Sequence, residues 1–227
     1  MDTLLYASII LESLSAKISL VDLYGWLSAK SLKSWVLFIV AFLWFLIRYK
    51  ITFSLPFINQ KYLQHGHSHF ALAGWITQAL MVLLSYKVSK EISLTHFKKH
   101  QWILFANLIA SFGMLLSFLI QGYASVSITF STLSILVSYI YAYRLWKDID
   151  AVPISKPGHK WFKAALVFHV LSSIGIFVMV YLMVTRNMNP NLHLAAIYLF
   201  LHFQYNGWFV FSCFGLLANK MHDEGVE

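Results

Sequence analysis

The chain has 227 residues, of which 59% are hydrophobic, 17% aromatic and only 11% charged. Soluble domains carry about a quarter charged residues, so this composition excludes an ordinary soluble domain and indicates helices that cross a bilayer. The net charge of +8 does not indicate nucleic-acid binding, because the basic residues crowd the connectors between apolar runs, as membrane topology requires. The single cysteine, Cys213, excludes an internal disulfide framework.

Residues 1–30 form an amphipathic segment ahead of the apolar runs. Glu12, Lys17 and Asp22 interrupt this segment, so it lacks the continuous apolar region of a cleavable signal peptide. The pattern predicts a helix that lies in the membrane interface rather than an additional span. We therefore divide the chain into an interfacial segment, residues 1–30, and a transmembrane bundle, residues 31–227.

Six apolar runs follow, and they predict an all-α integral membrane bundle of about six transmembrane helices. The expected spans cover residues 34–46, 64–86, 102–120, 125–145, 161–185 and 192–218. With both termini in the cytoplasm, thirteen of the seventeen Lys and Arg residues lie on the cytoplasmic side. The positive-inside rule therefore favours this orientation.

The second span opens with the sequence HGHSHFALAGW, residues 65–75. Because four residues of a helix turn through about 400°, His65 and His69 share a face, whereas His67 points to the opposite side. Two kinds of site are open to this pattern. His65 and His69 could coordinate one metal ion together, or His67 and His69 could each coordinate a separate iron. Gly74 leaves room for a flat macrocycle, and Trp75 supplies a stacking wall.

Two further histidines lie deep within later spans. His169 falls in the fifth span, and His202 lies about ten residues, or ~15 Å, into the sixth. A histidine at such depth faces the bundle interior and needs a partner, so both are candidate metal ligands. The remaining cytoplasmic histidines are expected to lie in loops and to have no metal-related role: His96, His100, His159 and His222.

The second and sixth spans also share a short motif. His69-Phe70 with Gly74-Trp75 matches His202-Phe203 with Gly207-Trp208, 133 residues further along the chain. Shifting the sequence by the same 133 residues also aligns the first expected span with part of the fifth. An internal duplication is therefore a hypothesis for this chain.

The pattern HxHxxxxGW, formed by His67, His69, Gly74 and Trp75, resembles the heme-ligand helix of subunit I in the heme–copper oxidase superfamily. The likeness is nearest to C-type cytochrome oxidases and nitric oxide reductases. It implies a b-type heme, with His67 approaching a high-spin heme and His69 a low-spin heme. The family's catalytic subunit has twice as many spans, and its copper site uses a His-His dipeptide that this chain lacks. The resemblance therefore implies a half-size, heme-binding relative.

Three functions are consistent with the sequence. The first is a heme-binding protein of the bacterial inner membrane that handles electrons or a diatomic gas, as a possible oxidoreductase with a redox partner or a further membrane subunit. The second is a copper or zinc site built from His65, His69 and His202. The third is a transporter or structural partner subunit without a cofactor. No membrane-embedded carboxylate is expected in the spans, which disfavours proton-coupled transport.

Overall fold

A computed structural model describes residues 39–49 and 59–225, and the expected interfacial segment 1–30 lies outside this part. The described chain is helical, with the elements α3 (Gln60–His69), η2 (Phe70–Thr77), α4 (Gln78–Ile92), α5 (Leu94–Gln121), α6 (Ser125–Asp150), α7 (Pro157–Val184), α8 (Pro190–His202), η3 (Phe203–Phe209) and α9 (Val210–Asp223). A short apolar helix, Ile39–Tyr49, precedes them. The expectation of an all-α bundle is confirmed.

Four helical runs of the described chain are long and apolar enough to cross a membrane: Gln60–Ile92, His96–Gln121, Ser125–Asp150 and Pro157–Val184. They contain the second to fourth expected spans and all of the fifth except its last residue, Thr185. Of the first expected span, the helix Ile39–Tyr49 belongs to the described part. The sixth lies within the continuous run of α8, η3 and α9.

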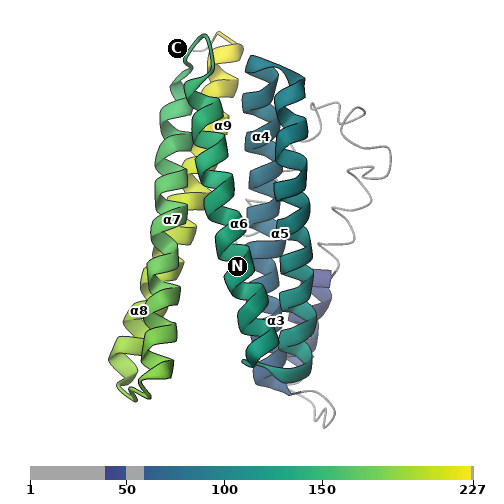
Figure 1. Cartoon of the computed structure of the whole chain (residues 1–227), viewed down its shortest axis with the longest axis vertical. Coiled ribbons are helices and arrows are strands. Elements are labelled where there is room, and N and C mark those ends of the chain that lie inside the picture. The colour runs from purple at the N-terminus through teal and green to yellow at the C-terminus, as the bar shows by residue number, and fades with distance from the viewer. Residues whose placement is uncertain (1–38, 50–58, 226–227) are drawn as a thin grey trace.

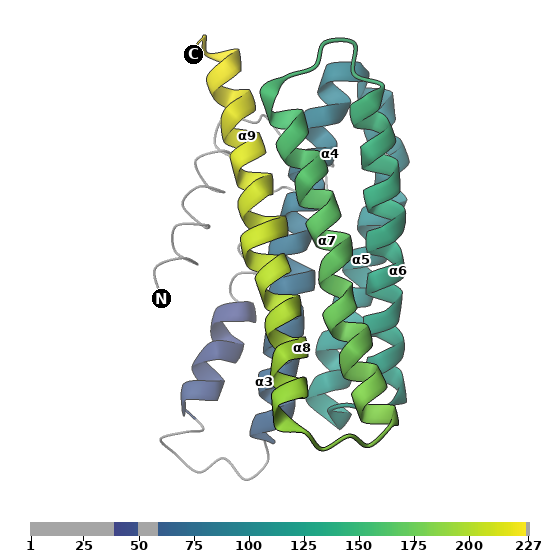
Figure 2. The same cartoon turned by 90° about the vertical axis from the view of Figure 1, so that its left-hand side faces the viewer.

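The long helices run alongside one another and alternate in direction (Figures 1 and 2). α3, η2 and α4 pack on α5, α5 packs on α6, and α7 packs on α8, η3 and α9. The α6–α7 connector and the C-terminal end of α9 lie at one end of the bundle, and the α5–α6 and α7–α8 connectors lie at the other (Figure 2). We call the first the lysine-rich end, because it carries Lys87, Lys156 and Lys160. The positive-inside rule predicts that this end faces the cytoplasm.

Local sequence explains where several helices begin. The side chain of Asn59 caps α3 by accepting from the backbone N–H of Lys61 and Tyr62. Pro157 and Pro190 occupy the first turns of α7 and α8, where a missing N–H costs nothing. At the tight α5–α6 turn, Gly122 has a φ of +62°, which suits glycine.

Small residues bring α7 and α9 close together. A Cβ added to Gly158 would lie 2.2 Å from the carbonyl oxygen of Gly215, so no side chain fits there. The Gly158 N–H donates to Oδ1 of the fully buried Asn219 at 2.8 Å. Close contact between small residues, with a polar side chain joining two helices, is how membrane helices associate without a hydrophobic driving force.

Candidate functional site

His65 and His69 lie on one side of α3, as the helical period predicts. The His69 ring stacks on Phe118 with a centroid distance of 4.4 Å, and its Nε2 lies 3.2 Å from the hydroxyl oxygen of Tyr123. The His65 ring meets the same tyrosine edge-on at 4.7 Å. α5 and the turn that follows it therefore supply an aromatic wall for both imidazoles.

His67 points away from that wall. Its imidazole interacts with the backbone of Val40, on the helix Ile39–Tyr49. The buried Nδ1 of His67 has no hydrogen-bond partner in the described chain. The prediction that His67 and His69 lie on opposite faces is confirmed.

Gly74 and Trp75 pack against protein groups. A Cβ on Gly74 would lie 2.7 Å from the ring of Phe70 and 2.9 Å from the Cβ of Ser111. The space beside Gly74 is therefore filled by Phe70 and by Ser111 of α5, and not by a cofactor. Trp75 is partly buried and packs against the apolar core on both sides of η2.

His202 ends α8 on an exposed part of the helix surface. Its Nδ1 lies 3.1 Å from Nδ2 of Asn206, one helical turn further on. The expectation that this ring faces the bundle interior is wrong, because the inward side of η3 is occupied by Gln204, Gly207 and Trp208. Within residues 39–49 and 59–225, no three His, Cys, Asp or Glu side chains gather closely enough to hold a metal ion.

His169 is the deep imidazole that does face inward, with only 7% of its surface exposed. The ring stacks on Trp208 at 4.6 Å, and its Nδ1 lies 3.4 Å from Oε1 of Gln204. Ser172 donates to the same oxygen at 3.0 Å, while the Gln204 amide nitrogen donates to Thr77 at 3.2 Å. The cluster joins α7 to η2 and η3 in the interior of the bundle.

The hydrogen bonds of Gln204 fix the proton on His169. With the amide nitrogen of Gln204 assigned to Thr77, its oxygen faces the imidazole and can only accept, so Nδ1 of His169 carries the hydrogen. Nε2 is then an unprotonated acceptor. It is buried and has no hydrogen-bond partner in the described chain. A neutral ring oriented through Nδ1–H, with a free Nε2, is the form in which histidine binds a metal.

Both copies of the repeated motif adopt the same unusual backbone. The segments η2 and η3 are π-helical, and each begins directly after the motif histidine, His69 or His202. Such segments are rare, and they often occur at functional sites. They also bring Thr77 and Trp208 together, since Nε1 of Trp208 donates to the Thr77 hydroxyl at 3.3 Å. The duplication stays a hypothesis, now with a matching feature of the backbone.

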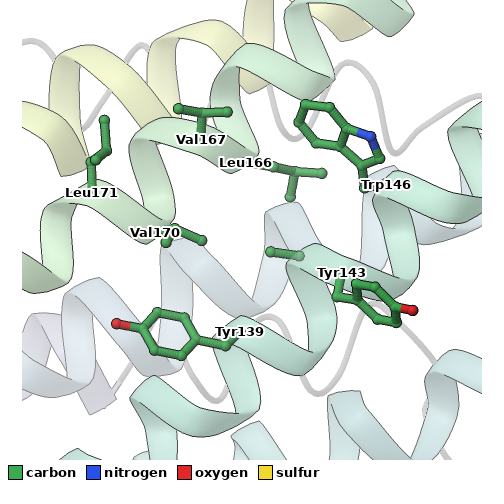
Figure 3. Close-up of a pocket in the computed structure, with 8 residues that line it drawn as sticks. Tyr139, Tyr143, Trp146, Leu166, Val167, Val170 and Leu171 are labelled. Carbon is green, nitrogen blue, oxygen red and sulfur yellow. The ribbon is translucent and has the colours of Figure 1, made fainter.

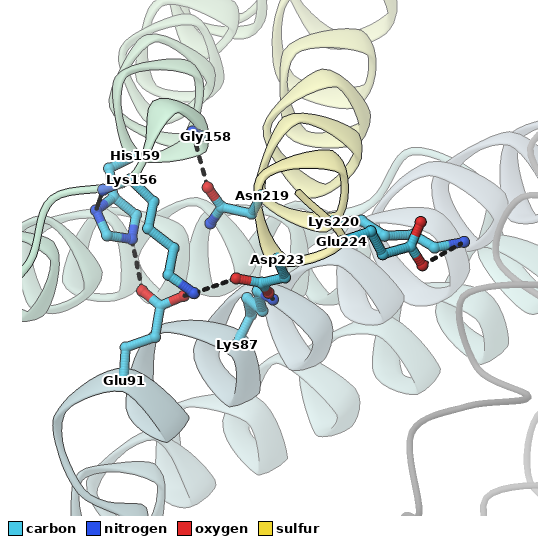
Figure 4. A network of polar contacts seen from close by, with 9 residues as sticks. All are labelled: Lys87, Glu91, Lys156, Gly158, His159, Asn219, Lys220, Asp223 and Glu224. Atoms are coloured by element: carbon cyan, nitrogen blue, oxygen red, sulfur yellow. Dashed lines mark hydrogen bonds and ion pairs between the residues drawn. The ribbon is translucent and has the colours of Figure 1, made fainter. Parts of the chain in front are cut away.

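A second polar cluster lies at the lysine-rich end (Figure 4). Glu91 on α4 accepts from Nε2 of His159 at 2.6 Å and pairs with Lys156 at 3.2 Å. Lys156 also pairs with Asp223 at the end of α9, and Asp223 pairs in turn with Lys87. The ends of α4 and α9 are thus tied to the start of α7.

His159 is part of a helix rather than a loop, and so are His96, His100 and His222, which corrects the sequence-based expectation for all four histidines. His159 occupies the first turn of α7, and its Nδ1 accepts from the Lys156 backbone N–H at 3.1 Å. Nε2 therefore carries the hydrogen that Glu91 accepts. His100, within α5, is likewise buried, with its Nε2 2.7 Å from Asp148. His96 and His100 both face Asp148, and their i, i+4 spacing could have indicated from the sequence that they share one helix face.

Asp223 gives this cluster a defined pH dependence. Partial burial opposes its ionisation, but the ion pairs with Lys156 and Lys87 outweigh that effect and hold the pKa of Asp223 at about 2, below its ordinary 3.8. A carboxyl group whose pKa falls on folding stabilises the protein when the pH is above the group's pKa in the unfolded state. That stabilisation is lost as the pH falls through the group's pKa in the folded state.

We expect Asp223→Asn to lower the thermal midpoint in detergent between pH 5 and 8 by an amount that changes little with pH. The cost is about 1 kcal/mol or less, because the carboxylate is 38% exposed and screened. As the pH falls from about 4 to about 2 the wild-type protein and the variant should converge, since folded Asp223 is protonated only as the pH falls through its pKa of about 2. The matched control is Glu224→Gln, which removes a looser pair with Lys220. A difference that grows as the pH falls would contradict this assignment.

An apolar groove of about 400 Å³ lies between α6 and α7 (Figure 3). Tyr139, Tyr143 and Trp146 line it from α6, and Val167 and Val170 line it from α7. It contains none of the candidate histidines. Its apolar lining suits a surface that faces lipid.

Comparison with protein-family models, curated proteins and solved structures gives no match. The four apolar membrane-length helices define the chain as an all-α membrane protein.

Proposed function

We propose that this chain is a heme-binding integral membrane protein, related to subunit I of cytochrome oxidases and nitric oxide reductases. The observation that carries the proposal is the buried Nε2 of His169, which is free to ligate while Gln204 holds Nδ1. A porphyrin supplies four nitrogens, so its iron needs only one or two protein ligands. His67, His69 and His169 point in different directions, so each would supply a single imidazole to such a centre.

The side chains around His169 fit an axial ligand in their chemistry. Gln204 accepts from Nδ1–H and so orients the ring and raises its basicity, while Trp208 fixes the ring plane by stacking. Burial among Thr77, Ser172 and Gln204 keeps bulk water away from Nε2. A bound heme would supply one-electron transfer and an open position for a diatomic gas.

The resemblance extends the proposal to the protein's setting. It implies a location in the bacterial inner membrane, with a redox partner or a further membrane subunit. It also assigns heme contacts to His67 and His69, near the end of the bundle opposite the lysine-rich end. Heme binding at His169 and heme binding at His69 can be tested separately, because the two imidazoles lie on different helices and each can be substituted alone.

A copper or zinc site is the second candidate. Its support is the pairing of His65 and His69 beside the Tyr123 hydroxyl, which places two imidazoles and a phenol oxygen on one side of α3. Imidazole is a good ligand for both metals. His202, the third ligand of the set expected from the sequence, lies on α8 and does not join this pair in the described part of the chain.

The visible spectrum of the purified protein distinguishes these functions. The heme proposal predicts a Soret band that shifts on reduction with dithionite, and His69→Ala is expected to lower heme content while the protein stays inserted. Stoichiometric copper or zinc by elemental analysis, with no Soret band, would favour the second candidate. Neither signal, after expression with excess heme precursor and metal salts, would refute both.

A further inference from the structure

A groove of about 770 Å³ opens at the lysine-rich end, between the start of α7 and α9. Its lining is divided in character. Lys156, Lys160 and Ser155 supply polar groups from the start of α7 and the connector before it, and His222 supplies one from α9. We propose that this groove binds an anionic phospholipid, with the headgroup at the polar rim.

The groove lining changes from polar to apolar along the helix axes, which matches the polar headgroup and apolar chains of a lipid. On α9, His222 and the groove residue Phe211 are eleven residues apart, or ~16 Å along the helix. On α7, Trp161 and Ala164 follow Lys160 toward the centre of the bundle. The Trp161 ring packs on Phe211 at 5.3 Å and remains 39% exposed, as an aromatic side chain at the membrane interface does. The groove thus offers charge at the headgroup level and an apolar wall below it.

The charge on the rim favours an anion. Lys156 is already neutralised by Glu91 and Asp223, and no acid is among the groove's lining residues. Lys160 is exposed and has no ion-pair partner in the described chain, so its charge is available. Basic pockets between membrane helices on the cytoplasmic side bind anionic headgroups in this way. A zwitterionic lipid carries no net negative charge that could neutralise Lys160.

Native mass spectrometry of the full chain in detergent tests this inference with phosphatidylglycerol and phosphatidylcholine as probes. We expect phosphatidylglycerol adducts at lower lipid concentration than phosphatidylcholine adducts. Lys160→Gln should weaken phosphatidylglycerol binding about fivefold, the loss expected for one lysine at an anionic surface. The control is Lys99→Gln, an exposed lysine of α5 at the same end but outside the groove, which should bind as the wild-type protein does.

Three outcomes would overturn the inference. Equal binding of the two lipids would remove the role of charge. An equal loss in Lys160→Gln and Lys99→Gln would mean that diffuse surface charge, rather than the groove, attracts the lipid. Displacement of phosphatidylglycerol by millimolar inorganic phosphate would identify a site for soluble anions. A thermal midpoint for each variant, measured in the same detergent, verifies that the folded proteins are being compared.

Discussion

Replacing Trp208 with alanine is expected to lower the free energy of unfolding by about 3 kcal/mol, at the low end of the range for a buried aromatic side chain. The indole is fully buried, stacks on His169 and donates to Thr77. Its removal leaves a cavity and deprives the Thr77 hydroxyl of one of its two hydrogen-bond donors. The low end applies because lipid is itself apolar, so the transfer term is smaller than in water. Unfolding by SDS in mixed micelles, followed by circular dichroism, measures the change.

The matched control is Trp102→Ala, because Trp102 is 78% exposed near the start of α5. That change should stay within about 0.5 kcal/mol of the wild-type protein. Trp208→Phe should lie between the two, since it keeps a stacking ring and loses only the bond to Thr77. If Trp208→Ala unfolds at the wild-type SDS fraction, then η3 does not pack on α7 as described.

Glu91→Ala is expected to have an effect of similar size, about 3 kcal/mol. The Glu91 side chain is 11% exposed, and its loss leaves the buried imidazole of His159 without an acceptor and Lys156 without one of its two acids. Breaking a buried pair by removing one partner is costly because the remaining group stays desolvated.

A double-mutant cycle isolates the pair. His159→Ala alone should also destabilise, whereas Glu91→Ala combined with His159→Ala should cost at least about 1 kcal/mol less than the sum of the single changes. The same SDS titration provides all four values. Additive effects would show that the 2.6 Å contact between the two side chains contributes nothing to stability.

The bundle could be predicted from the sequence because apolar run length alone specifies membrane helices. The opposite directions of His67 and His69 were also predictable, because within a single helix the direction of a side chain follows from its spacing in the sequence. The ends of the helices were less predictable. α5 and α7 begin before their apolar runs, so that His100 and His159 lie within the polar first part of each helix, where they contact Asp148 and Glu91.

The environment of His169 could not be predicted, because it depends on three elements that are distant in sequence. Gln204 reaches His169 only because η3 packs on α7, and Thr77 holds Gln204 only because η2 lies beside them. His202 was misplaced for the same reason. Depth along a helix can be counted from the sequence, but the side that faces inward is set by packing, and η3 turns Gln204 and Trp208 inward instead.

Heme content of His169→Leu, measured by pyridine hemochrome and referred to protein concentration, tests the central claim most directly. Leucine fills the buried site without a ligand atom, and His96→Leu, which removes a partly exposed histidine at the lysine-rich end, is the control. We predict a wild-type Soret band that His96→Leu retains and His169→Leu loses, while both variants remain folded by circular dichroism. Wild-type heme content in a folded His169→Leu protein would contradict the assignment of iron to this imidazole.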